Sequence, residues 1–187
     1  MNSEAVSETV SSWLDTFVVG MNLCPFAGQE ITQGRVRLAV TDADDEPTLL
    51  AALQDEILAL ARDPATETTL LIHPLVFNDF LDYNDFLSVS DSLLQDMNAE
   101  GEFQIASFHP HYQFAETEFD DAENYTNRSP FPLLHILRER SVSHAVETHP
   151  NVDEIPANNI AQLNKLGTEH LQSLWSTMGG NSHEQNV

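Results

Sequence analysis

The chain has 187 residues, of which 41% are hydrophobic, and 30 acidic side chains outnumber seven basic ones to give a formal net charge of −23. This charge argues strongly against nonspecific binding to nucleic acid or anionic lipid, because both need clustered cations. No apolar run reaches the roughly 18 residues of a membrane span, and no signal peptide is evident, so we expect a cytoplasmic protein.

The N-terminal half of the chain predicts alternating helices and strands. Residues 3–21 place apolar side chains at helical spacing. Residues 35–40 alternate apolar and polar side chains, which is typical of a strand. Pro47 is suited to the first turn of a second helix over 47–62, and the short β-branched, apolar run at 69–73 predicts a second strand.

The C-terminal half is predicted to be richer in helix. In chain order we expect a helix at 78–97, a strand at 103–108, an irregular stretch at 111–128, a helix at 129–140, a last helix from 155 and a flexible tail at 176–187. Ser129 and Pro130 are suited to the cap and first residue of the helix at 129–140. The irregular stretch is long and rich in aromatic residues, which favours an ordered lid or site loop.

Strands that alternate with helices favour βαβ units and a parallel sheet. The expected fold class is therefore α/β, with a single domain over residues 1–175. Its small, mostly parallel sheet would have about three strands flanked by helices, and its C-terminal part would be helix-rich.

Two predicted strands end in the same pair of residues, His73-Pro74 and His109-Pro110. If these strands run parallel, both imidazoles lie at the carboxyl edge of the sheet, where open α/β sheets bind ligands. His109 is then a candidate catalytic residue. The alternative is that each histidine only binds a backbone carbonyl where its strand ends.

A second polar group surrounds the predicted helix at 129–140. Arg128 lies at its start, between Asn127 and Ser129, where a guanidinium and the helix dipole both favour an anion. On that helix His135, Arg138 and Glu139 would share one arc, with Arg138 binding an anion, His135 moving a proton and Glu139 orienting the His135 ring. The alternative is an exposed helix face with salt bridges.

Cys24 is the single cysteine and precedes Pro25. If it caps a short helical turn, its thiol pKa falls, which favours a nucleophile, a redox thiol or a metal ligand. The alternative is a small buried hydrophobe, as free cysteine usually is.

Several segments together resemble the uncharacterised bacterial DUF1415 family. They are 20–27 (GMNLCPFA), 79–87, 108–114 (FHPHYQF), 126–139 (TNRSPFPLLHILRE) and 155–160. The resemblance implies a soluble bacterial protein of about this length. It does not imply any particular activity, because the family has no assigned function. It directs attention to the residues that match the family's motifs, which are Cys24, His109, Asn127, Arg128, Ser129, His135, Arg138 and Glu139.

Three classes of function follow from these residues. The first is an enzyme acting on a small anionic metabolite, with Cys24, His109 and His135 as catalytic residues and Asn127, Arg128, Ser129 and Arg138 as substrate-binding residues. The second is a Zn, Fe or Mn protein with ligands among His109, His111, His135, Asp120 and Asp121. The third is a non-catalytic binding or adaptor protein in which the segment at 127–129 is a structural corner. The sequence specifies neither a cofactor nor an oligomeric state.

Overall fold

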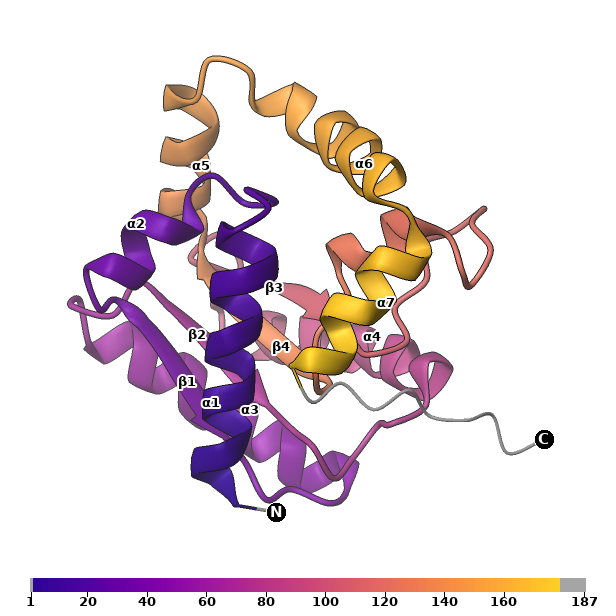
Figure 1. Ribbon diagram of the computed structural model, residues 1–187. Helices are drawn as coiled ribbons and strands as arrows, with labels where there is room; N and C mark the ends of the chain where they lie inside the picture. Colours follow the sequence, from indigo (N-terminus) through magenta and orange to yellow (C-terminus); the bar gives the residue numbers. More distant parts are fainter. Residues whose placement is uncertain (1, 179–187) are drawn as a thin grey trace.

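The computed structural model describes residues 2–178 and contains one mixed sheet of four strands within that range (Figure 1). The strands are β1 (Val36–Val40), β2 (Thr68–Ile72), β3 (Phe103–Phe108) and β4 (Leu133–Arg138), in the order β1-β2-β4-β3. β1 and β2 are parallel, whereas β4 is antiparallel to both of its neighbours, β2 and β3. β2 and β3 therefore run in the same direction on either side of β4.

Seven α-helices and three shorter helical segments surround this sheet in the described residues. The α-helices are α1 (Ser3–Trp13), α2 (Ala27–Thr32), α3 (Glu46–Arg62), α4 (Phe80–Asp96), α5 (Glu139–Thr148), α6 (Ile155–Leu166) and α7 (Thr168–Thr177). The others are a π-helix, η1 (Leu14–Val19), and the 3-10 turns η2 (Ala122–Thr126) and η3 (Val152–Glu154). Over residues 2–178 none of the helices is long and apolar enough to cross a bilayer. The cytoplasmic location predicted from the sequence stays a prediction.

Two hydrophobic cores lie on opposite faces of the sheet. One core joins α3 and α4 to side chains such as Leu71, Leu134 and Ile136. The other joins α1, η1, η2 and α7 to side chains such as Leu70 and Leu133. Figure 1 shows α1 and α7 in front of the sheet and α3 behind it. We call these the α3–α4 face and the α1–α7 face.

Most elements agree with the sequence predictions, and local signals explain why. α3 begins after Asp45, whose carboxylate accepts a hydrogen bond from the Thr48 N–H. The predicted last helix is two helices, α6 and α7, because the chain turns at Gly167 with a φ of 80°. The short helical turn expected at Cys24-Pro25 is instead the helix α2, which begins after Phe26 and has no side-chain cap, so Cys24 does not cap it. Residues 176–177 of the predicted tail belong to α7, and 179–187 lie outside the described residues.

The predicted helix at 129–140 is wrong, because residues 133–138 form the strand β4. β4 lies between two strands, and Leu133, Leu134 and Ile136 are fully buried across its two faces. Because these buried residues point to both faces, the segment reads as a nearly continuous apolar run, which periodicity cannot distinguish from a buried helix. The insertion of β4 also makes the sheet mixed and four-stranded, and not mostly parallel with three strands.

Gly20 ends the π-helix η1 at a place that has no room for a side chain. Its N–H donates to the Asp15 carbonyl over 2.9 Å, and a Cβ here would lie 2.4 Å from the Thr16 carbonyl oxygen. We expect Gly20→Ala to lower the free energy of unfolding by about 2–4 kcal/mol, measured by urea denaturation, since the backbone must shift to admit the methyl group. Gly28→Ala is the matched control.

At Gly28, in α2, the added Cβ would meet only Val19 Cγ1 at 3.5 Å, which is ordinary contact. Gly28→Ala should therefore raise the free energy of unfolding by about 0.5–1 kcal/mol through helix propensity. Equal effects of the two substitutions would contradict the steric explanation of Gly20.

Candidate functional site

His73 and His109 lie at the same edge of the sheet, as predicted from the two His-Pro pairs. The residues before them, Ile72 and Phe108, both pair with Leu133 at the start of β4. The Tyr83 ring lies between the two imidazoles, with centroid distances of 5.8 Å to His73 and 5.1 Å to His109. Its hydroxyl donates to the Leu133 carbonyl and accepts the Phe108 N–H. Tyr83 thus ties the end of β3 and the start of β4 to α4.

The His109 ring makes a backbone contact at each of its nitrogens. Nε2 lies 3.1 Å from the Phe77 carbonyl oxygen, and Nδ1 lies 3.0 Å from the His111 N–H. This pairing fixes the tautomer with the proton on Nε2. The ring is fully buried, and burial lowers the pKa of His109 to about 4. A neutral ring with both nitrogens occupied connects two loops and has no open atom for a substrate.

His73 is also fully buried, and burial likewise lowers its pKa to about 4. Its Nδ1 lies 3.1 Å from the Val76 carbonyl oxygen, whereas its Nε2 has no hydrogen-bond partner. Because Nδ1 faces an acceptor, the proton belongs on Nδ1 and Nε2 carries the lone pair. This ring, too, is held neutral inside the protein.

The segment at 127–129 is bound to neighbouring backbone. Asn127 Nδ2 donates to the Ser107 carbonyl over 3.1 Å, and Ser129 Oγ donates to the Phe131 carbonyl over 2.7 Å. Arg128 is 5% exposed, and its Nε and Nη2 donate to the carbonyls of Tyr112 and Phe119 over 3.2 and 2.5 Å. Residues 127–129 precede the strand β4, which begins at Leu133, so they stabilise a loop and do not lie at the start of a helix.

Two aromatic rings enclose the Arg128 guanidinium. Its Cζ lies 4.6 Å from the centroid of Phe119 and 4.7 Å from that of Tyr125. Burial lowers the pKa of Arg128, and no carboxylate of the described residues lies within 4.0 Å of its guanidinium nitrogens. Aromatic faces and carbonyl oxygens supply the stabilisation that a bound anion would otherwise give.

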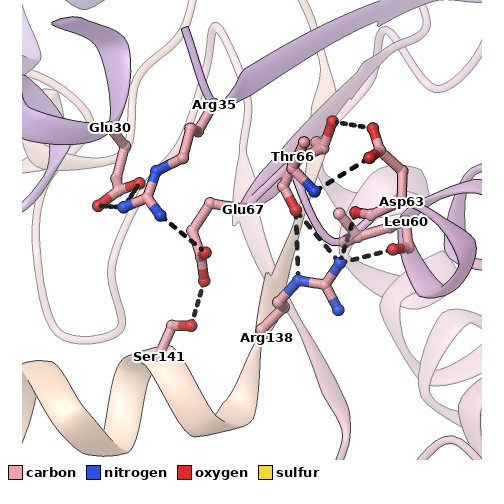
Figure 2. A network of polar contacts seen from close by, with 9 residues as sticks. Glu30, Arg35, Leu60, Asp63, Thr66, Glu67, Arg138 and Ser141 are labelled. Atoms are coloured by element: carbon pink, nitrogen blue, oxygen red, sulfur yellow. Dashed lines mark hydrogen bonds and ion pairs between the residues drawn. The ribbon is translucent and has the colours of Figure 1, made fainter. Parts of the chain in front are cut away.

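Arg138 closes the end of α3 in the same way (Figure 2). Its Nη2 donates to the carbonyls of Leu60, Asp63 and Thr66 over 2.6, 3.0 and 3.2 Å, and its Nε donates to the last of these over 3.3 Å. The last carbonyls of a helix have no partner within the helix, and a cation there also complements the helix dipole. The Arg138 guanidinium is therefore occupied by backbone.

Figure 2 also shows an ion-pair network beside Arg138. Arg35 lies 2.7 Å from a Glu30 carboxylate oxygen and 3.7 Å from one of Glu67. Ser141 Oγ donates to Glu67. These contacts join α2, the adjoining ends of β1 and β2, and α5.

His73 and His135 each have one unpaired ring nitrogen, but His73 is fully buried whereas His135 is only partly buried. His135 Nε2 lies 2.7 Å from Thr68 Oγ1, and that hydroxyl donates to the Ile136 carbonyl over 2.7 Å. Because the Thr68 proton is used there, His135 Nε2 must carry the proton that it donates to Thr68, which leaves the lone pair on Nδ1. Nδ1 makes no hydrogen bond with the described residues, and the ring is only partly buried. Burial lowers the pKa of His135 to about 4.

The predicted arc of His135, Arg138 and Glu139 is wrong, because it assumed a helix. The first two residues lie on β4, and Glu139 begins α5. Neighbouring side chains of a strand point to opposite faces, so His135 faces the α1–α7 side and Arg138 the α3–α4 side. Arg138 pairs with Phe103 at one end of β4, whereas His109 lies beyond the other end, roughly 17 Å away along the strand. Arg138 therefore cannot share one ligand with His135 or with His109.

The α1–α7 face of β3 and β4 is incompletely covered around His135. Gln104, Ala106 and Phe108 on β3 and Leu137 on β4 share this face with His135, and all five are partly exposed. On the opposite face of β4, Leu134 and Ile136 are fully buried. We call Gln104, Ala106, Phe108, His135 and Leu137 the open floor. Gln104 is not among the site residues predicted from the sequence, although the alternation along 103–108 places it on the face of Phe108.

Cys24 lies in the turn between η1 and α2, with a free and partly buried thiol. Its neighbours Met21 and Leu23 belong to the same core cluster as Leu70, the cross-strand partner of His135. The Leu23 carbonyl accepts a hydrogen bond from Asn159 on α6 over 2.8 Å. Cys24 and His135 are therefore on the same side of the sheet, while His109 and residues 127–129 meet at its carboxyl edge.

A metal site has no ligand set in the part of the chain that the structure describes. Over residues 2–178 no group of three or more His, Cys, Asp or Glu side chains could hold a metal ion. His109 and His111 are neighbours, with ring centroids 5.7 Å apart, but a backbone N–H occupies His109 Nδ1.

Comparison with known proteins gives a family and no function. No curated protein matches the chain, and no solved structure does. A family model described as "Protein of unknown function (DUF1415)" matches residues 5–173, which is most of the sequence. The segments that carry His109, Arg128 and His135 all lie within this match. The chain belongs to the DUF1415 family.

Proposed function

We propose that the protein binds a small uncharged molecule on the open floor and that His135 is its main polar contact. The observation that carries this proposal is the fixed tautomer of His135. Thr68 holds its Nε2–H, so that a lone pair is left on Nδ1 of a partly exposed ring in an interior strand. A binding site needs a few positioned polar groups within an apolar surface, and the open floor has this composition.

The chemistry of the floor specifies the class of ligand. With a pKa of about 4, His135 is unprotonated at neutral pH, so Nδ1 accepts a hydrogen bond and the ligand must donate one. Gln104 supplies an amide that makes no hydrogen bond with the described residues, and Phe108 supplies an aromatic ring. A flat molecule with a hydroxyl or N–H group suits these three side chains.

Phenol and anisole form a matched pair of probes, because anisole has the same ring but no donor. We expect phenol to shift the His135 and Phe108 NMR resonances, with a dissociation constant at least fivefold lower than that of anisole, as the loss of one hydrogen bond predicts (about 1 kcal/mol). Equal binding of both probes, or shifts that occur elsewhere, would contradict the proposal.

Two substitutions of His135 separate its two ring nitrogens. His135→Asn places an oxygen near the position of Nδ1, whereas His135→Gln reaches the position of Nε2 and preserves the contact with Thr68. We expect His135→Gln to weaken phenol binding about fivefold and His135→Asn to leave it within about twofold. The reverse order would show that Nδ1 is not the contact.

An enzyme is the second candidate, and the position of Cys24 on the same side of the sheet as His135 favours it. In such an enzyme Cys24 would supply the thiol nucleophile and His135 the base that takes up the thiol proton. The anionic substrate predicted from Arg128 and Arg138 has less support, because backbone carbonyls occupy both guanidinium groups. Turnover that Cys24→Ser abolishes, while phenol binding persists, would favour the enzyme.

A further inference from the structure

We infer that a hollow beside the π-helix is a second site, which takes a small apolar ammonium ion. The hollow has a volume of about 210 Å³ and lies between α1 with η1, α2 and β1. Figure 1 shows α1 crossing in front of β1, with α2 above the start of that strand. Its lining residues are Ser11, Leu14, Asp15, Ile31, Val36 and Leu38.

The π-helix shapes one wall of this hollow. α1 changes to η1 at Leu14, and the Gly20 N–H bonds to Asp15, five residues back, and not four. The extra residue in each turn bulges the backbone, and π-helical turns occur frequently at functional sites. Leu14 and Asp15, at the start of η1, both line the hollow. The π-helical backbone leaves no room for a Cβ at position 20, so it requires the glycine that the sequence has there.

The lining combines an apolar floor with one negative charge. Leu14, Ile31, Val36 and Leu38 are apolar, whereas Ser11 and Asp15 are exposed at the rim. The side chains of Ser11 and Asp15 make no hydrogen bond or ion pair with the described residues, so a carboxylate and a hydroxyl are open to a ligand.

Charge and size limit the occupant to a small organic cation. A carboxylate on a chain of net charge −23 attracts cations and repels anions. A cavity of about 150 Å³ lined by apolar side chains holds benzene, so this hollow has room for one ring with a short ammonium arm. Benzylammonium has the required apolar ring and positive charge.

Binding of benzylammonium, benzyl alcohol and benzoate to the full chain tests the inference. We expect benzylammonium to bind most tightly and benzoate least, with amide shifts at Ser11 and Asp15 in two-dimensional NMR. Asp15→Asn should weaken benzylammonium three- to fivefold, the range of a partly exposed ion pair, and leave benzyl alcohol unchanged. Asp85→Asn, an exposed carboxylate on α4, is the matched control and should change neither.

Three results would overturn the inference. They are equal binding of benzoate and benzylammonium, the same loss in Asp15→Asn and Asp85→Asn, and shifts that map to other residues. Because Asp15 is exposed, Asp15→Asn should keep the fold, which its amide spectrum reports directly. The outcome is independent of phenol binding at His135, which lies on other strands.

Discussion

Arg128→Met should lower the free energy of unfolding by about 3–5 kcal/mol. The substitution removes two hydrogen bonds from a charged donor, each worth about 1.5–3 kcal/mol, and leaves the carbonyls of Tyr112 and Phe119 without that partner. It also removes two cation–π contacts. Urea denaturation followed by circular dichroism measures the loss. The irregular stretch at 111–128 should open when the guanidinium is removed, because Arg128 holds its Tyr112 and Phe119 carbonyls together.

Two companion variants give this prediction its controls. Arg62→Met removes an exposed arginine at the end of α3 and should cost less than about 0.5 kcal/mol. Arg128→Lys keeps the positive charge, but a lysine ammonium cannot donate to both carbonyls as the planar guanidinium does. This variant should therefore lose most of the free energy of unfolding that Arg128→Met loses. If Arg128→Met is as stable as the original chain, and phosphate raises the melting temperature of the original chain but not of the variant, Arg128 is an anion site and not a structural residue.

Acid should destabilise the protein between pH 6.5 and about 4, before most exposed carboxylates titrate. His73, His109 and His135 have pKa values of about 4 in the fold and 6.5 when unfolded. As the pH falls through this window the unfolded chain takes up protons that the folded protein does not, so the unfolded state is favoured. Their stabilising contribution is complete above pH 6.5 and is lost progressively below it.

The expected loss is on the order of 5 kcal/mol between pH 7 and pH 4.5, since each pKa unit corresponds to about 1.4 kcal/mol and His135 is only partly buried. Urea denaturation at pH 7.0, 6.0, 5.0 and 4.5 measures it. His170→Gln, which changes a histidine on the exposed side of α7, should leave the pH profile unchanged. A constant free energy of unfolding between pH 6.5 and 5 would contradict the neutral state of His73, His109 and His135 in the folded protein.

Much of the local structure follows from sequence patterns. Pro47 marks the start of α3, and the apolar run predicted at 69–73 folds as β2, at 68–72. The His-Pro pairs place two imidazoles at one edge, and the structure confirms that placement. In each case the signal comes from neighbouring residues, or from two strands that follow the same pattern.

The rest depends on contacts between distant parts of the chain. Residues 133–138 form a strand because β2 and β3 supply hydrogen bonds on both sides, whereas their own apolar pattern also suits a helix. An arginine side chain is a common anion ligand, which is why the sequence suggests an anion site at Arg128 and Arg138. In the fold, backbone carbonyls from distant segments accept the hydrogen bonds of both guanidinium groups. Likewise, the open Nδ1 of His135 requires the position of Thr68, 67 residues earlier.

The protonation of the two His135 ring nitrogens can be measured by ¹⁵N NMR of histidine-labelled protein at pH 7. We expect a proton on Nε2, none on Nδ1, and a shift of the Nδ1 resonance when phenol is added. A proton on Nδ1, or an Nδ1 resonance that saturating phenol leaves unchanged, would contradict this expectation.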